Sequence, residues 1–548
     1  MSTMEKQLAQ RGESMRKAGF WVDKTMDDFL GQALKVCPDK EALIAYRIDR
    51  DLPVRMTYRQ LADRVNRAAA ALHRLGVRHG DVVAVQLPNW WEFVVATLAC
   101  GRIGAVMNPL MHIFRERELT HMLGFARAKV FISPTSYRGF DFAGMATNLK
   151  TTLPNLQHIV LVDGDAQYGF DQILQAGEET SGIQVPDGAR PLMPDDLAVL
   201  MFTSGTTGSP KGVMHTTNTL VACMNALSGR FGLGGDDIYL ASTPVGHMTG
   251  YVAVVLIGLR QCGTVVMQDF WDAKKGVSIM VDEKVTYFAG STPFLNDMCE
   301  VVATGQPAPK VLKSFLCGGA QIPPVLVEKA RNIMGINVCS LWGMTEVLSG
   351  TLTEPTRSID KASTSDGRAL EGMDVKIVDD EGREVPVGCP GRLLVRGAQM
   401  FLGYYKMPEI SITDAQGWFD SGDLAYTDNE GYIRICGRTK DVLIRGGENV
   451  PVVEIEGLLS KHPTVMMASI VGYPDERLGE RACAFVVLRA AQTLTIESLR
   501  TYMDESKVAK QYWPEKLIVV DAMPSTPSGK VQKFKLKEIE RSSIKTTD

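Results

Sequence analysis

An apolar run that leads directly into a loop of very small residues is the feature that most constrains this chain. Residues 197–202, LAVLMF, have the continuous apolar character of a buried strand. The next ten, TSGTTGSPKG at 203–212, are Gly, Thr, Ser and Pro apart from Lys211. Glycines let a backbone approach a ligand, hydroxyls donate to phosphate oxygens, and the lysine adds positive charge. The pattern predicts a phosphate-binding loop rather than an ordinary surface loop.

This loop is not a standard P-loop. The spacing G-x-x-x-x-G-K-[ST] occurs neither here nor around Lys530. The phosphate-binding interpretation therefore depends on composition and on the preceding strand, and it needs support from other motifs along the chain.

Length and composition limit the protein class. A chain of 548 residues is too long for one hydrophobic core, so two or more domains are expected. A net charge of -4 argues against a nucleic-acid partner. The longest apolar run, 251–259, is too short to cross a bilayer, and the charged first residues do not resemble a signal peptide. Ten scattered cysteines without C-x-x-C, and eight histidines without H-E-x-x-H, favour a reducing cytoplasm over a disulfide framework or a zinc site.

Strand and helix patterns alternate through the first half of the chain. Apolar positions at helical spacing predict a helix within 56–76, followed by a buried strand at 81–88 and a second helix from residue 89. Strand patterns return at 129–134 and 158–163. This alternation predicts an α/β fold with a parallel sheet. No chemistry is evident in this half, and the Trp90 and Trp91 pair is interpreted as packing.

The middle of the chain contains two candidate ligand-binding turns. A helix is predicted over 212–227, and His247 then lies in a bend before an apolar helix, where a structural turn histidine is the commoner interpretation. FLCGGAQIPP at 315–324 predicts a strand that enters a glycine turn, a weak signal alone. In SLWGMTEV at 340–347, Glu346 is a hard oxygen ligand of the kind that Mg²⁺ prefers, although an isolated Glu is more often a helix-start carboxylate.

Two further motifs follow toward the C-terminus. In WFDSGDLAYTDNEGYIRICGRTKD at 418–441, Asp423 follows a glycine in a bend, where its carboxylate can accept bonds from two hydroxyls. Short strands and helices then alternate, which predicts a small separate domain. PSTPSGKVQK at 524–533 contains Lys530, which by itself would be interpreted as a solvated surface lysine.

In this order, the four motifs resemble those of the adenylate-forming superfamily, which includes acyl-CoA synthetases, nonribosomal adenylation domains and firefly-type luciferases. The resemblance extends from about residue 56 to 533 and is greatest to bacterial cyclohexanecarboxylate and medium-chain acyl-CoA ligases. It implies a large α/β N-terminal domain, 1–438, and a small mobile α+β C-terminal domain, 439–548. The chain departs from the family at Trp342, where Tyr is usual, and at Val452, where Pro is frequent.

The resemblance also implies the site residues. Those implied for ATP or AMP are Thr203, Ser204, Gly205, Thr206, Thr207, Gly208, Lys211, Gly318, Gly319, Ala320, Trp342, Gly343, Met344, Thr345, Asp423 and Arg438. Those implied for catalysis are Lys530, Thr345 and Glu346, with Glu346 as the Mg²⁺ ligand. The acyl pocket is implied to include His247, Met248 and Tyr251. Lys440 is implied as the hinge, and Gly446 and Gly447 are implied to bind coenzyme A.

The activity implied is ATP-dependent ligation of a carboxylic acid to coenzyme A through an acyl-AMP intermediate. The small domain would rotate between the two steps, so that Lys530 serves only the first. Expected pocket walls at 247–251, 291–294, 318–321 and 341–344 are small or apolar, which favours an uncharged acid; an alicyclic acid is expected, with medium-chain and aromatic acids as alternatives.

An enzyme that uses a different acceptor and a luciferase-like oxygenase are the alternatives. A non-catalytic nucleotide-binding protein on the same fold would be expected to have lost Lys530 or Glu346, and both are present. Acetylation of Lys530 by a lysine acetyltransferase, reversed by a deacetylase, is expected as regulation, because it removes the charge of the lysine.

Overall fold

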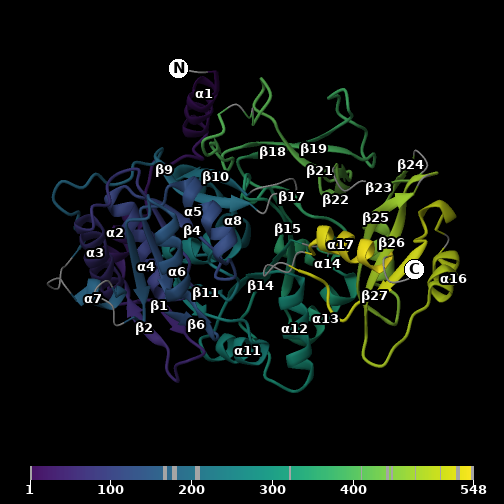
Figure 1. Ribbon diagram of the computed structural model, residues 1–548, viewed down its shortest axis with the longest axis horizontal. Coiled ribbons are helices and arrows are strands. Elements are labelled where there is room, and N and C mark those ends of the chain that lie inside the picture. Colours follow the sequence, from purple (N-terminus) through teal and green to yellow (C-terminus); the bar gives the residue numbers. More distant parts are fainter. Residues whose placement is uncertain are drawn as a thin grey trace.

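The computed structural model describes residues 3–164, 169–175, 182–203, 210–319, 322–408, 410, 412–439, 443–445, 448–475, 477–506, 508–525 and 531–544. Two large sheets with covering helices form the N-terminal part. The strands drawn in green lie along one side, and the yellow C-terminal elements lie at the opposite end from the purple N-terminal helices (Figure 1).

The first large sheet contains the apolar strand predicted at 197–202. Within the described residues its order is β20-β10-β9-β4-β3-β5-β8. Its members are β3 (Val82–Val85), β4 (Val106–Pro109), β5 (Val130–Pro134), β8 (His158–Val162), β9 (Leu197–Thr203), β10 (Lys211–Thr216) and β20 (Gly403–Tyr404). Strands β3, β4, β5, β8 and β9 are parallel, as predicted, whereas β10 runs antiparallel to β9 and β20.

The helix predicted at 212–227 was wrong in its first residues. Residues 211–216 form strand β10, and α8 (Thr217–Phe231) begins only after Thr216, whose side chain accepts a hydrogen bond from the amide of Thr219. The segment that joins β9 to β10 is too short for a crossover helix, so the two strands can pair only antiparallel.

The second large sheet has the order β17-β16-β15-β14-β13-β11-β12-β1-β2 in the described part of the chain. Its members are β1 (Glu41–Tyr46), β2 (Val54–Thr57), β11 (Ile238–Ala241), β12 (Thr264–Gln268), β13 (Tyr287–Gly290), β14 (Ser314–Gly318), β15 (Asn337–Trp342), β16 (Thr351–Leu352) and β17 (Arg368–Ala369). The six strands from β1 to β15 in this order are parallel, and antiparallel strands flank them.

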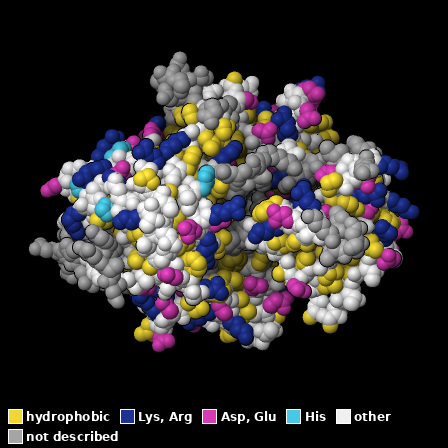
Figure 2. Space-filling model, viewed as in Figure 1, with side chains coloured by type: hydrophobic (Ala, Val, Ile, Leu, Met, Phe, Trp, Pro, Cys, Tyr) yellow, Lys and Arg dark blue, Asp and Glu magenta, His cyan; other side chains and the backbone are white. Residues whose placement is uncertain are grey.

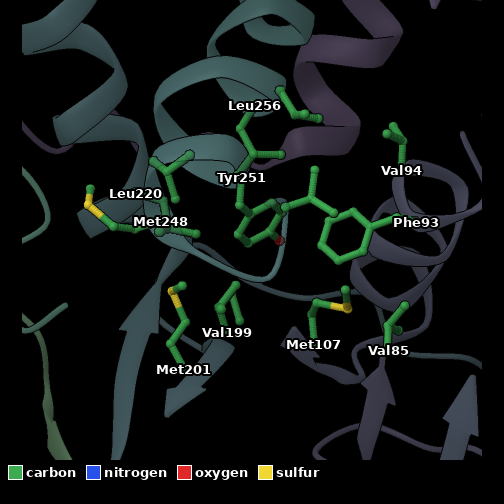
Figure 3. Packing of buried hydrophobic residues seen from close by; sticks show 14 of the residues in the cluster. Val85, Phe93, Val94, Met107, Val199, Met201, Leu220, Met248, Tyr251 and Leu256 are labelled. Atoms are coloured by element: carbon green, nitrogen blue, oxygen red, sulfur yellow. The ribbon is translucent and has the colours of Figure 1, made fainter. Parts of the chain in front are cut away.

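Helices cover these sheets and share a continuous apolar core. They include α2 (Met26–Val36), α3 (Tyr58–Arg74), α4 (Trp91–Ile103), α5 (Glu116–Ala126), α6 (Phe142–Thr152), α7 (Phe170–Gln175), α11 (Ala273–Asp282), α12 (Thr292–Ala303) and α13 (Pro324–Met334). Helix α3 starts with a capping box between Thr57 and Gln60, which confirms the helix predicted there. Trp90 and Trp91 are buried, which confirms their interpretation as packing residues. Figure 3 shows side chains of α4, α8 and strands β3, β4 and β9 meeting in this core.

Smaller sheets complete the molecule. The first contains β18 (Met373–Val378), β19 (Gly391–Gly397), β21 (Phe419–Thr427) and β22 (Ile433–Arg438). The C-terminal sheet contains β23 (Leu443–Arg445), β24 (Glu448–Val450), β25 (Val465–Asp475), β26 (Gly479–Leu488) and β27 (Lys516–Val519), with helices α15 (Val452–Leu459), α16 (Ile496–Glu505) and α17 (Lys533–Ile544). Its apolar side chains form clusters of their own.

The surface carries charges of both signs. Lys and Arg side chains are interspersed with Asp and Glu over the face shown in Figure 2. Among the described residues, no helix combines the length and apolar character that a membrane crossing requires.

Candidate active site

Two neighbouring parallel strands end side by side at the centre of the candidate site. Gly318, the last residue of β14, is paired with Leu341 of β15, and Trp342 ends β15. Gly319 has φ +89°, and a Cβ on Gly343 would lie 2.1 Å from the carbonyl oxygen of Leu348. Both positions therefore require glycine. The carboxyl ends of adjacent parallel strands are where α/β sheets bind ligands.

A buried carboxylate is held at this edge by two side chains. The indole N–H of Trp342 donates to Oδ2 of Asp423 over 2.8 Å, and Nε of Arg438 lies 2.9 Å from Oδ1. Asp423 and Arg438 face each other in register across β21 and β22. The sheet pairing thus joins Asp423 to Arg438, and the hydrogen bond from β15 of the neighbouring sheet adds Trp342, so three of the residues predicted for the nucleotide meet here.

Glu346 is the second buried carboxylate of the site. Its Oε1 accepts a hydrogen bond from the hydroxyl of Tyr404 over 3.0 Å, and its exposure is only 6%. Burial raises the pKa of Glu346, while Tyr404 and the charges of Arg438 and Lys211 act in the opposite direction. The ammonium of Lys211 lies 4.7 Å from the centre of the Tyr404 ring. The positive charge of Lys211 favours the ionised form of the Glu346 carboxylate.

The backbone carbonyl of Thr345, the residue before Glu346, is bound by the ring of His215. Nε2 of His215 lies 2.7 Å from the carbonyl oxygen of Thr345, and Nδ1 lies 3.1 Å from the hydroxyl of Thr219. Burial lowers the pKa of His215 to about 4, so the ring is neutral at pH 7. Because a carbonyl can only accept, the proton lies on Nε2.

The structure places the ends of the Gly/Thr-rich loop together. Thr203 and Lys211 are partners across β9 and β10, so the loop starts and ends at one place, and Lys211 lies beside Tyr404, the hydrogen-bond partner of Glu346. The other predicted residues Ser204, Gly205, Thr206, Thr207, Gly208, Ala320, Lys440, Gly446, Gly447 and Lys530 lie outside the described residues.

The predicted acyl-pocket residues lie on one helical stretch. His247 is half-buried and accepts a hydrogen bond from the amide of Thr249, while Met248 and Tyr251 are buried. Residues from Tyr251 to Leu256 wind as a π-helix, η1, a form that is frequent at functional sites. The ring of Tyr251 meets that of Phe93 edge-on at 5.5 Å (Figure 3). It also lines a cavity of about 60 Å³ with Thr97, Met107, Val199, Leu220 and Leu256.

Sequence reasoning missed Tyr404 and His215. Tyr404 is 58 residues from Glu346, and His215 is 130 residues from Thr345. A Gly-Tyr-Tyr run at 403–405 is the only local signal for the first, and no signal marks the second. Both act by contacts between segments that are distant in sequence.

The donor set around Glu346 suits a divalent ion held jointly with phosphate. No group of three or more His, Cys, Asp or Glu side chains that could hold a metal occurs among the described residues. Mg²⁺ typically takes one or two carboxylates together with substrate phosphate oxygens and waters. A single buried carboxylate beside a Gly/Thr-rich loop fits that pattern.

Comparisons with known proteins agree with this geometry. The sequence profile described as "AMP-binding enzyme" matches residues 30–405, and that of the "AMP-binding enzyme C-terminal domain" matches 454–530. The chain is 36% identical over 541 residues to a medium-chain fatty-acid–CoA ligase of Escherichia coli K12, covering 96% of this chain and 93% of that protein. It is 32% identical over 532 residues to a 2-hydroxy-7-methoxy-5-methyl-1-naphthoate–CoA ligase of Streptomyces carzinostaticus, covering 95% and 94%.

Solved structures share the fold. The anthranilate CoA ligase AuaEII in complex with anthranoyl-AMP superposes with a TM-score of 0.84 at 25% identity, covering 95% of this chain and 98% of that one. ATP-bound MatB from Rhodopseudomonas palustris gives a TM-score of 0.82 at 26% identity, covering 94% and 98%. The predicted fold, a large α/β N-terminal domain with a small C-terminal domain, is confirmed.

Proposed function

Because this chain belongs to the family of AMP-binding enzymes, we infer that it is an acid–thiol ligase that joins a carboxylic acid to AMP and then to the thiol of coenzyme A. The observation that carries this inference is a pair of buried carboxylates around Arg438, which pairs with Asp423 and whose charge opposes the burial that raises the pKa of Glu346. Asp423 is held by Trp342 and Arg438, and Glu346 lies beside Tyr404 at the ends of the Gly/Thr-rich loop.

In the first step, the oxygen of the substrate carboxylate forms a bond to the α-phosphorus of ATP, and pyrophosphate leaves. Asp423 accepts bonds from the ribose hydroxyls, and the glycines at 318–319 allow the base to lie against the backbone. Lys211 and Thr203 bind the phosphates at the loop ends, and Thr345 donates to the α-phosphate. Glu346 would hold Mg²⁺, which when bound neutralises charge on the phosphates.

In the second step, the thiol of coenzyme A attacks the acyl carbonyl and AMP leaves. We propose that the small domain starts at residue 439 and turns about Lys440 between the steps, so that Gly446 and Gly447 line the thiol's path. Lys530 assists only the first step. The two separate family matches, to 30–405 and 454–530, support a two-part chain. All ten cysteines are unpaired, which supports a reducing compartment such as the cytoplasm.

The acid is proposed to be uncharged and apolar, with an alicyclic acid preferred and medium-chain and aromatic acids as alternatives. The buried side chains of Met248 and Tyr251, and the cavity that Tyr251 lines, support an apolar tail. The relatives named for fatty and for aromatic acids are compatible with either alternative.

The decisive test is product analysis with purified protein, ATP, Mg²⁺, coenzyme A and a panel of alicyclic, straight-chain and aromatic acids. We expect acid-dependent pyrophosphate release and a CoA thioester. Adenylate release without thioester would indicate another acceptor, and light emission with oxygen would indicate an oxygenase. An absence of pyrophosphate release with every acid would favour a nucleotide-binding protein without catalysis.

The proposal that Lys530 assists only the first step has its own test. Lys530→Ala is expected to lower adenylate formation by about two to three orders of magnitude, because one charged donor at the transition state is lost. The same variant should still convert supplied acyl-AMP to thioester. Equal loss of both steps would contradict the domain rotation. Acetylation of Lys530 by an acetyltransferase should mimic the alanine variant, since it removes the charge.

A further inference from the structure

An N-terminal helix that precedes the family match contacts a segment next to the candidate site. Helix α1 (Thr3–Lys17) lies wholly before residue 30, where the match begins. Nη1 of Arg11 donates to the carbonyl oxygen of Phe401 over 3.1 Å. The indole N–H of Trp21 donates to the carbonyl oxygen of Ala398 over 2.9 Å. Figure 1 shows α1 on the same side of the molecule as β18 and β19.

The segment that Arg11 and Trp21 contact, residues 398–404, holds Glu346 at two points. The amide of Phe401 donates to the carbonyl oxygen of Glu346 over 2.9 Å, and the hydroxyl of Tyr404 donates to its Oε1 over 3.0 Å. Leu402 is tied to β10 through the carbonyl oxygen of Met214. A shift of this segment would therefore move both the backbone and the carboxylate of Glu346.

Burying Arg11 is energetically unfavourable if its side chain serves only to dock the helix. Its Nε and Nη2 atoms are inaccessible and have no hydrogen-bond partner among the described residues. Burial lowers the pKa of Arg11 to about 10, so the guanidinium is still charged at neutral pH. An apolar side chain would fill this place at less cost. A charged donor on the Phe401 carbonyl, however, polarises the peptide group between Phe401 and Leu402, and it strengthens the bond that the Leu402 amide makes to the carbonyl oxygen of Met214, which anchors segment 398–404 to β10.

We propose that Arg11 is a positioning residue for Glu346, acting through segment 398–404. The inference rests on the proposed function, in which Glu346 binds the metal of the metal–ATP complex. It assigns to the N-terminal helix a part in organising the site.

The test compares Arg11→Met with Arg16→Met in the full-length protein. Arg16 is the matched control because it also lies over the Trp21 ring, at 5.5 Å, but pairs with Asp23 and Asp195 rather than with segment 398–404. Hydrogen–deuterium exchange of the free protein reports on the amides of Phe401 and Leu402. Electron paramagnetic resonance reports on Mn²⁺ binding with a non-hydrolysable ATP analogue.

In Arg11→Met we expect faster exchange in peptides that cover 398–404 and about tenfold weaker Mn²⁺ binding, the size expected for one lost bond from a charged donor. Arg16→Met should match the wild type, and Arg11→Lys should restore part of both signals. If Arg11→Met does not fold, Arg11→Lys and Arg11→Ala with added guanidinium give the same readouts.

Unchanged exchange at 398–404 would overturn the proposal, and so would faster exchange with unchanged Mn²⁺ binding. Failure of the proposed function gives a different result. In that case both signals respond to Arg11→Met, but the wild-type protein forms no adenylate with any acid.

Discussion

At the scale of single residues, Trp342 is the side chain that fixes one oxygen of the Asp423 carboxylate. Its indole N–H donates to Oδ2 of Asp423, while Arg438 occupies the side of Oδ1, and both Trp342 and Asp423 are buried. A carboxylate with both oxygens engaged has one orientation. Each oxygen keeps a lone pair for a ribose hydroxyl. Trp342 is thus expected to orient Asp423 as well as to lie near the base.

Trp342→Phe keeps an aromatic ring but removes the N–H donor. Loss of a hydrogen bond to a buried carboxylate is worth about 1.5–3 kcal/mol, so the KM for ATP should rise by at least about tenfold, with little change in the KM for the acid. Steady-state kinetics of pyrophosphate release measures both. Trp418→Phe is the control, because Trp418 contacts Lys376 and Arg396 instead. An unchanged KM for ATP would contradict an orienting role for Trp342.

At the scale of elements, the π-helix η1 places the aromatic ring that should set the acid's size. Tyr251 is fully buried, meets Phe93 edge-on and lines the 60 Å³ cavity. In a π-helix the turn is wider than in an α-helix, so side chains leave the regular spacing of an amphipathic stripe. The ring therefore closes one wall of a cavity that would otherwise be larger.

Tyr251→Leu should shift the preference toward larger acids. Each additional buried methylene contributes about 0.8 kcal/mol, so kcat/KM for acids one or two carbons longer should rise about fourfold per carbon relative to shorter acids. Tyr251→Phe is the control, since it keeps the ring and loses only the hydroxyl. Competition between straight-chain acids of increasing length measures the profile. An identical profile in the leucine variant would exclude Tyr251 from the acyl pocket.

Helices and strands were predicted from the sequence far better than contacts between segments that are distant in sequence. The alternation of helices and strands, the capped helix at 58–74 and the glycine turn at 318–319 follow from local spacing and backbone chemistry. The family is confirmed for the same reason, because its motifs are local. Strand β10 was missed because pairing with β9 overrode a helix-like pattern. Arg11 was missed because its partner, Phe401, lies 390 residues away.

At the scale of the whole molecule, a charge cluster around the buried Arg47 joins the two large sheets. Arg47 follows β1 of one sheet, Asp163 follows β8 of the other, and the two are ion-paired. Arg47 also pairs with Asp49 at 3.1 Å and lies 3.6 Å from the centre of the Trp90 ring. Glu92 of α4 is only 2% exposed and lies 3.9 Å from Nη1 of Arg47, beyond hydrogen-bond distance. The guanidinium is thus shared chiefly between the two aspartates.

Glu92 should make the stability of this junction depend on pH. Burial raises the pKa of Glu92 from 4.5 to about 8, against a smaller opposing effect of Arg47. Below pH 4.5 the side chain is neutral in both folded and unfolded chains. As the pH rises toward 8, only the unfolded chain ionises freely, so the folded state loses stability relative to a protein with a neutral side chain at this position.

Glu92→Gln should therefore match the wild type near pH 4.5 and melt a few degrees higher at pH 8. Thermal unfolding across this range measures the difference, with the exposed Glu381→Gln as control; a gap that does not grow with pH would mean that Glu92 is ionised in the folded protein.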